Sequence, residues 1–350
     1  MFRPVSRARP TRIPIRTRQT KHPAPVYRGG VFAFRTTASG ANRAPRSKRS
    51  RRSRVARRAT RRQPVFAHRM AAWSVPAETN ASGTTTPGLP DRRRARRPAP
   101  MPHSSHFSKR SGFMSQTSGS MITFRRPDGQ ELQGYLATPA KTEGAPAVVV
   151  IQEWWGLNDQ IRGVADRLAR CGYFALVPDL YRGKSTVEEE EAHHLMTGLD
   201  FGDAASQDIP GAVTHLKTLA SRVAVTGYCM GGALTLLSLQ FADADAGVTW
   251  YGLPPLDYLD PAKIKVPLMG HWSTQDAFFA IDQVDALEKK LTDAKVNVEF
   301  HRYLAHHAFA NETAVGPGRI AGTQFDPVWS QMAWDRTLTF FGRTLWAKQG

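Results

Sequence analysis

The stretch Val223-Ala-Val-Thr-Gly-Tyr-Cys-Met-Gly-Gly-Ala-Leu-Thr-Leu-Leu237 decides the fold of this chain. Residues 223–226 are apolar or β-branched and predict a buried strand, and residues 233–240 carry apolar side chains at helical spacing. Between them lies Gly-x-Cys-x-Gly, whose glycines permit a tight strand-to-helix turn that exposes the middle side chain. The start of the helix would direct N–H groups at the sulfur of Cys229, which favours a thiolate. The alternative is a buried, inert cysteine.

Basic residues are concentrated in the first third of the 350-residue chain. Residues 1–113 contain 28 Lys and Arg but only two acidic side chains, whereas residues 114–350 carry 20 basic and 27 acidic side chains. The net charge of +19 therefore belongs to the amino-terminal segment. Two cysteines exclude a disulfide framework and fit a reducing compartment, and the chain lacks the run of about 18 apolar residues that a membrane span needs. We expect a cytoplasmic protein with no membrane partner.

Residues 1–113 are rich in Arg, Pro and Ser and show no sustained helical or strand periodicity, so we predict a disordered basic extension. Three explanations are open. In the first, the segment is upstream sequence joined to the gene in error, and translation starts at Met114 or Met121. In the second it is an organellar transit peptide, and in the third it is a nucleic-acid-binding tail. The first is preferred because residues 114–350 would by themselves make a complete domain. A nucleic-acid partner is accordingly not expected.

Strands alternate with helices from Met121 onward. The patterns predict strands at 121–124, 132–138, 147–151, 173–177, 223–226, 246–251, 266–270 and 296–303, and helices at 159–170, 188–199, 210–219, 233–240, 281–291 and 327–345. The continuous apolar run 147–151 suits a strand that is buried on both faces. The alternation predicts an α/β fold with a mostly parallel central sheet and helices on both of its faces.

The residues that follow each strand are the candidates for chemistry, because ligands of such sheets bind beyond the carboxyl ends of the strands. Cys229, Asp276 and His307 each follow a predicted strand, in the chain order nucleophile, acid, histidine that is typical of α/β-hydrolases. A thiol needs a base that titrates near neutrality, and a carboxylate fixes the tautomer of that imidazole. We assign these three roles to Cys229, His307 and Asp276.

Each of these assignments has a rival. His306 competes with His307, and only one of them can act because adjacent side chains on a loop point apart. His301 lies inside a predicted strand and is expected to be structural. Asp276 could instead cap a helix or a turn.

Four motifs, in the correct order and spacing, resemble the dienelactone hydrolase family over about 230 residues from Met121 onward. They are Gln152-Glu-Trp-Trp-Gly-Leu-Asn158, Pro178-Asp-Leu-Tyr181, Gly227-Tyr-Cys-Met-Gly-Gly232 and His307-Ala-Phe309. The resemblance implies an α/β-hydrolase fold and a Cys229–His307–Asp276 triad. It also implies that Glu153 lies beside the thiol and helps to hold or receive its proton.

The resemblance also implies an oxyanion hole formed by the backbone N–H groups of Met230 and Trp154. Glu153 is followed by Trp154 and Trp155, so we expect it to be partly desolvated, with a raised pKa.

The chain departs from the family at the positions that hold a substrate carboxylate. Members that act on dienelactone use arginines there. One arginine lies four residues past the histidine, where this chain has Asn311, and another lies within residues 185–210, which here contain no Lys or Arg. We therefore expect a neutral, apolar ester or lactone as substrate. The expected pocket residues are Trp155, Trp272, Tyr228 and Phe309.

These observations predict a monomeric cytosolic thiol hydrolase of small carboxylic esters or lactones, with its domain at residues 114–350 and with no metal or cofactor. One alternative is a catalytically inactive hydrolase fold that binds or regulates, with a basic tail on nucleic acid. Retention of all three triad residue types argues against it. Another is a redox-sensing Cys229, which would form a sulfenic acid under mild oxidant without ester turnover.

Overall fold

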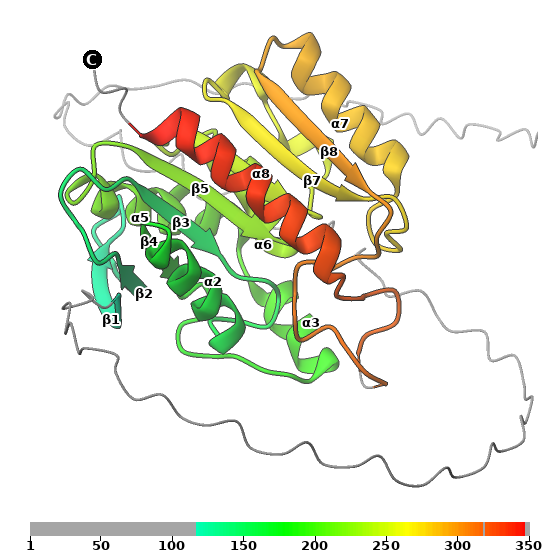
Figure 1. Ribbon diagram of the computed structural model, residues 1–350, viewed down its shortest axis with the longest axis horizontal. Coiled ribbons are helices and arrows are strands. Elements are labelled where there is room, and N and C mark those ends of the chain that lie inside the picture. Colours follow the sequence, from blue (N-terminus) through cyan, green and yellow to red (C-terminus); the bar gives the residue numbers. More distant parts are fainter. Residues whose placement is uncertain (1–116, 318, 347–350) are drawn as a thin grey trace, which may run out of the picture. The chain divides into compact units, whose positions relative to one another are not determined.

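The computed structural model describes residues 117–317 and 319–346, so the predicted basic extension over residues 1–113 lies outside the described residues. The described chain forms one sheet with helices on both faces (Figure 1). Its strands are β1 (Ser118–Arg125), β2 (Glu131–Thr138), β3 (Ala147–Ile151), β4 (Phe174–Pro178), β5 (Val223–Tyr228), β6 (Ala246–Trp250), β7 (Leu268–Ser273) and β8 (Val298–Tyr303). Their order in the sheet is β1-β2-β4-β3-β5-β6-β7-β8. The predicted α/β-hydrolase architecture is confirmed.

Six of the eight strands run parallel. Strands β4, β3, β5, β6, β7 and β8 pair in parallel register, whereas β2 is antiparallel to both β1 and β4. The carboxyl ends of β3, β5, β7 and β8 therefore meet at one edge of the sheet. The predicted Glu153, Cys229, Asp276 and His307 all follow these strands.

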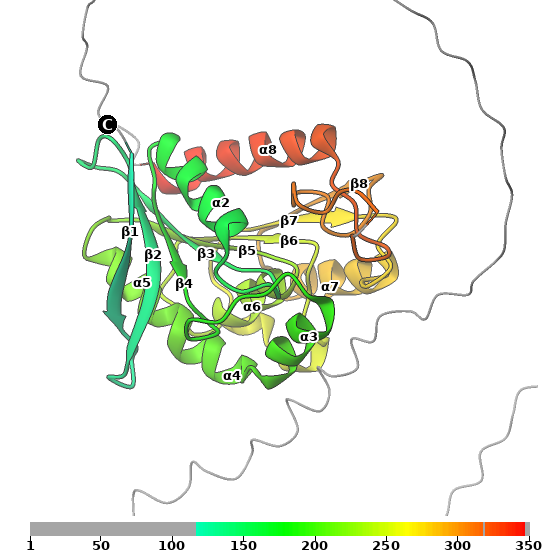
Figure 2. The same cartoon turned by 90° about the horizontal axis from the view of Figure 1, so that it is seen from below.

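Helices α2 (Asp159–Arg170) and α8 (Pro327–Leu345) cover one face of the sheet, and α5 (Ile209–Lys217), α6 (Met230–Ser238) and α7 (Ile281–Asp293) cover the other (Figure 2). Every residue of β3 is buried. Val148 and Val150 belong to the apolar cluster under α2 and α8, whereas Val149 and Ile151 belong to the cluster under α5, α6 and α7. This two-sided burial explains the unbroken apolar run in the sequence.

Two short helices and a π-helical turn connect β4 to α5. They are α3 (Glu189–Gly198), α4 (Phe201–Asp203) and the π turn Ala204–Asp208. Arg126, at the end of β1, donates hydrogen bonds to Asp203 and Asp208 at 2.8 Å, and Asp208 also accepts from Arg182. Buried carboxylates persist in proteins when they are paired, so this ion-pair cluster ties the β1–β2 hairpin to the π turn. Short 3₁₀ turns, Leu256–Tyr258 and Pro261–Lys263, lie between β6 and β7.

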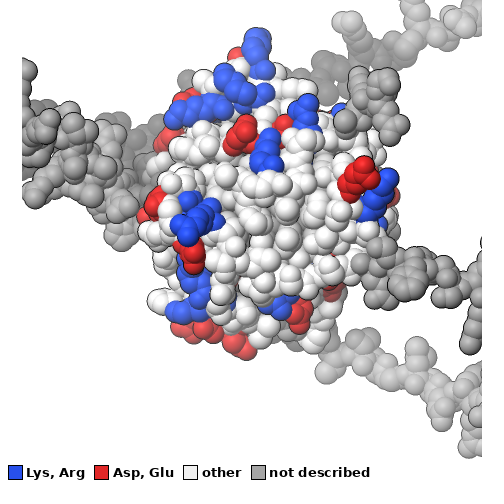
Figure 3. Space-filling model, turned by 90° about the vertical axis from the view of Figure 1, so that its left-hand side faces the viewer, with Lys and Arg blue, Asp and Glu red and all other residues white. Residues whose placement is uncertain are grey.

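Surface charges of both signs lie next to one another on the face in Figure 3, around a broad uncharged area. None of the helices in the described part of the chain is long and apolar enough to cross a membrane.

Candidate active site

Cys229 lies in a strained turn between β5 and α6. Its backbone has φ 53° and ψ −116°, a conformation that costs a non-glycine residue about 1–3 kcal/mol and persists only where the surroundings enforce it. Its N–H donates to the carbonyl of Trp250 at 3.0 Å. A Cβ at Gly227 would overlap the carbonyl oxygen of Gly231, and one at Gly231 would lie 2.5 Å from the carbonyl oxygen of Ile151. Only glycine fits at either position, which explains the Gly-x-Cys-x-Gly pattern.

His307 and Asp276 form a buried pair. The Nδ1 atom of His307 lies 2.8 Å from Oδ2 of Asp276. The other carboxylate oxygen of Asp276 accepts the backbone N–H groups of Phe278 at 2.8 Å and Phe279 at 3.0 Å. Asp276 therefore has a fixed orientation, and it in turn orients the imidazole.

Cys229 lies near enough to His307 to raise the pKa of its imidazole, and both side chains line the same cavity. Backbone contacts also fix the loop of His307, which bridges to Thr323 and accepts the N–H of Gln324 at 2.9 Å. The structure thus brings Cys229, His307 and Asp276 together. The rival His306 is only partly buried, and its ring nitrogen lies 3.2 Å from the carbonyl oxygen of Gln275.

The surroundings of His307 favour its protonated form. Burial lowers the pKa of the imidazole, but the charges of Asp276 and Cys229 and the hydrogen bond to Asp276 outweigh burial, and the pKa is raised well above its usual value. The rings of Tyr251 and Phe278 lie 5.1 and 4.8 Å from the imidazole. A buried imidazolium stabilises the neighbouring sulfur as a thiolate, which is the form in which cysteine acts as a nucleophile.

Glu153 follows β3 and is 5% exposed. The hydroxyl of Tyr251 donates to its Oε1 at 3.1 Å, and Nδ2 of Asn311 donates to its Oε2 at 2.5 Å. Burial raises the pKa of Glu153, against the opposing effects of His307, Asn311 and Tyr251. Sequence reasoning missed Tyr251 altogether and treated Asn311 only as the absence of an arginine. The available signal for Tyr251 was its place at the end of the predicted strand 246–251, on the same sheet edge.

A cavity of about 840 Å³ opens above Cys229, and Glu153, His307, Trp154 and Trp155 line it as well. Further apolar walls come from Val187, Met196, Phe278, Phe279, Ala308, Ala314, Ile320 and Ala321. Among the described lining residues, Arg319 is the only arginine or lysine. Its guanidinium donates to the carbonyl oxygens of Thr323 at 2.8 Å and Gly316 at 3.1 Å. Sequence reasoning missed Arg319, because no motif marks it.

Three expected pocket residues lie elsewhere, and their placement is corrected. Trp272 lies inside β7 and packs on Phe300, with ring centroids 5.1 Å apart. Tyr228 is the last residue of β5 and stacks on Trp250 at 5.0 Å. Phe309 is fully buried against aromatic rings of the core. The strands extend further than the sequence suggested, so the side chains of Trp272 and Tyr228 point to the faces of the sheet rather than past its edge.

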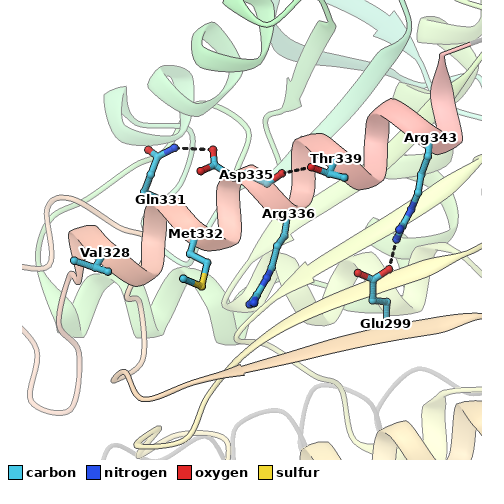
Figure 4. Close-up of a pocket in the computed structure, with 8 residues that line it drawn as sticks. All are labelled: Glu299, Val328, Gln331, Met332, Asp335, Arg336, Thr339 and Arg343. Atoms are coloured by element: carbon cyan, nitrogen blue, oxygen red, sulfur yellow. Dashed lines mark hydrogen bonds and ion pairs between the residues drawn. The ribbon is translucent and has the colours of Figure 1, made fainter.

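A second groove lies between α8 and the edge strand β8 (Figure 4). Its volume is about 540 Å³, and its polar groups pair with one another, as Arg343 does with Glu299 and Gln331 with Asp335. Its described lining residues include no cysteine, serine or histidine. Among the described residues, no group of three or more His, Cys, Asp or Glu is placed to hold a metal ion. The candidate active site is therefore the cavity above Cys229.

The strand order and the residues at the strand ends together define an α/β-hydrolase. The model of the dienelactone hydrolase family matches residues 132–345, and the chain belongs to this family. It is thus an enzyme, a carboxylic ester hydrolase of the dienelactone hydrolase type.

Relatives of nearly the same length as residues 114–350 support this assignment. "Protein usf" of Aquifex pyrophilus is 35% identical over 235 residues, which are 64% of this chain and 97% of that protein. "Carboxymethylenebutenolidase 1" of Cupriavidus pinatubonensis is 32% identical over 63% of this chain and 94% of its own. The solved structure named m3DLH is 26% identical, with a TM-score of 0.57 over 65% of this chain and 99% of that chain.

Proposed function

We propose that the protein hydrolyses a small carboxylic ester or lactone, with Cys229 as nucleophile, His307 as general base and acid, and Asp276 as the residue that orients His307. The observation that carries this proposal is the hydrogen bond between His307 and Asp276 beside Cys229, with Cys229 and His307 in the wall of one cavity. The alternative of a catalytically inactive fold has no observation in its favour.

In the first half of the reaction, Cys229 gives its proton to His307 and the sulfur attacks the carbonyl carbon. The tetrahedral intermediate collapses, the carbon–oxygen bond of the leaving group breaks, and His307 returns the proton to the leaving alkoxide. A thioester on Cys229 remains. In the second half, His307 takes a proton from water, the hydroxide attacks the thioester, and the acid leaves as the thiol is restored.

The oxyanion hole belongs to the same proposal. Met230 is the first residue of α6, so its backbone N–H has no acceptor within the helix. Trp154 directly follows Glu153 in the loop after β3 and lines the cavity. Two preorganised N–H donors of this kind stabilise the charge that develops on the carbonyl oxygen, and removal of one such donor costs about 10²–10³ in kcat.

We further propose that the substrate is neutral and largely apolar, because four aromatic residues, Trp154, Trp155, Phe278 and Phe279, contribute to the cavity wall. The one arginine of the described lining, Arg319, is held by two backbone carbonyls. Residues 114–350 are assigned to a single hydrolase domain, and the protein to a cytoplasmic monomer. Sedimentation or size-exclusion measurements on the full chain would test the last point.

The test compares hydrolysis of p-nitrophenyl acetate with that of cis- and trans-dienelactone by the full chain. We expect turnover of the neutral ester and slower turnover of the two anionic lactones. Fast dienelactone turnover would contradict the neutral substrate class. Absence of all three activities in a folded protein would contradict the hydrolase mechanism. Sulfenic acid formation at Cys229 without turnover would assign the thiol to redox sensing instead.

A further inference from the structure

Asn311 holds Glu153 through a side chain whose orientation is fixed. Its Oδ1 accepts the backbone N–H of Thr313 at 2.9 Å and the hydroxyl of Thr313 at 2.6 Å. A carboxamide that accepts through its oxygen on one side must present its NH₂ group on the other, and that group lies 2.5 Å from Oε2 of Glu153. Asn311 is 2% exposed, so water does not compete for this contact.

Tyr251 holds the other carboxylate oxygen. Its hydroxyl donates to Oε1 of Glu153 at 3.1 Å, and its ring packs against His307 and Phe309 at 5.1 and 5.3 Å. Each oxygen of Glu153 therefore has its own donor from the protein. The described hydrogen-bond partners of the Glu153 carboxylate are thus Tyr251 and Asn311 and not the thiol of Cys229.

We propose that Asn311 is a positioning residue that, with Tyr251, keeps Glu153 as a buried carboxylate within electrostatic reach of His307, so that Glu153 stabilises the imidazolium rather than taking the thiol proton. This inference rests on the proposed function. In this proposal Glu153 is a second carboxylate, after Asp276, that stabilises the imidazolium of His307. His307 then remains the base for Cys229 in the enzyme without substrate.

The pKa of Glu153 is raised overall, because burial outweighs the groups that favour its ionised form. Burial raises the pKa of Glu153, while His307, Asn311 and Tyr251 lower it and the nearby Glu312 raises it. The attraction is reciprocal, so an ionised Glu153 favours the protonated form of His307. The groups that face His307 are Asp276, Cys229 and the Tyr251 ring, with Glu153 acting over a longer distance.

The test replaces the amide without changing its shape. Asn311→Leu removes the donor and leaves Oε2 of Glu153 buried without it, which favours the protonated, uncharged carboxyl. Loss of that charge should lower the pKa of His307 by on the order of one unit, the size expected for a neighbouring charge in a buried site. The measurement is an NMR titration of the full chain with ¹³C-labelled histidine, in which His307→Gln identifies the His307 resonance.

Gln152→Leu is the matched control. Gln152 is a fully buried amide next to Glu153 in the sequence, and both polar atoms of its side chain are without a partner among the described residues. We expect the His307 titration of this variant to match that of the wild type. Tyr251→Phe, which removes a single hydroxyl, should lower the pKa of His307 as Asn311→Leu does, and it serves if the latter does not fold.

A merely structural Asn311 would lower the thermal stability of Asn311→Leu and leave the His307 titration unchanged, and this result would overturn the inference. An equal shift in Gln152→Leu would do so as well. Because the titration needs no substrate, failure to hydrolyse esters would overturn the proposed function and leave the shift measurable. An unshifted His307 in an active variant would overturn only the role of Asn311.

Discussion

Asp276→Asn is the substitution whose consequence can be worked out most fully from the structure. One oxygen of Asp276 accepts the N–H groups of Phe278 and Phe279. An asparagine must keep its carbonyl oxygen on these donors, so its NH₂ group would face Nδ1 of His307, 2.8 Å away. Nδ1 would then have to accept, which places the ring proton on Nε2, the nitrogen that should receive the proton of Cys229.

The expected loss follows from this change of tautomer. Loss of general-base action costs about 10²–10⁴ in rate, and the equivalent substitution in a serine protease triad costs about 10⁴ in kcat. For Asp276→Asn we expect kcat/KM for p-nitrophenyl acetate to fall by about 10²–10⁴, or ~3–5 kcal/mol of transition-state stabilisation. The side chain keeps its shape and its two backbone donors, so the turn should persist, and the loss of stability should be limited to the part that the Asp276 charge supplies through His307.

The assay measures kcat/KM near pH 7 together with thermal melting by circular dichroism. Activity that stays within about threefold of wild type would refute the assignment of Asp276, because loss of general-base catalysis would lower the rate by much more.

Four further predictions concern the same site. Cys229→Ala should abolish ester turnover while the far-ultraviolet spectrum stays unchanged; unaltered hydrolysis would exclude the thiol as nucleophile. His307→Ala should lose at least about 10² in kcat/KM and His306→Ala less than about threefold, and the reverse pattern would mean that His306 is the base. Arg319→Ala should leave KM for p-nitrophenyl acetate within about twofold; a rise confined to anionic esters would show that Arg319 binds a carboxylate. The raised pKa of His307 adds stability that is complete below about pH 6.5 and is lost as the pH rises through the folded-state value, so the stability advantage over His307→Gln should shrink on going from pH 6 to pH 9.

The layers and the catalytic candidates could be predicted from the sequence because local patterns encode them. A continuous apolar run gives β3, helical spacing gives α2 and α8 at their observed bounds, and strand ends bring Cys229, Asp276 and His307 to one edge. Because parallel strands place their carboxyl ends at the same edge of the sheet, the topology alone brings these three residues to that edge.

Strand ends and long-range contacts could not be predicted in this way. Periodicity does not show that β7 continues to Ser273, and this extension turns Trp272 from an expected pocket residue into a core residue. Glu153 is hydrogen-bonded by Tyr251, which lies 98 positions later in the chain, and by Asn311, which lies 158 positions later. No local sequence pattern encodes such contacts. The sequence indicates only that Asn311 replaces an arginine of the family. The structure shows that its side-chain amide donates a hydrogen bond to Glu153.

The central claim is that Cys229 carries a covalent acyl group during turnover. The most direct test mixes the full chain with excess p-nitrophenyl acetate, quenches with acid at short times, and maps the acetylated peptide by mass spectrometry. The account predicts one acetyl group per chain as a hydroxylamine-sensitive thioester on the peptide that contains Cys229, formed at the rate of the initial burst of p-nitrophenol. Steady turnover with no acetyl group on Cys229, and equal turnover by Cys229→Ala, would contradict it.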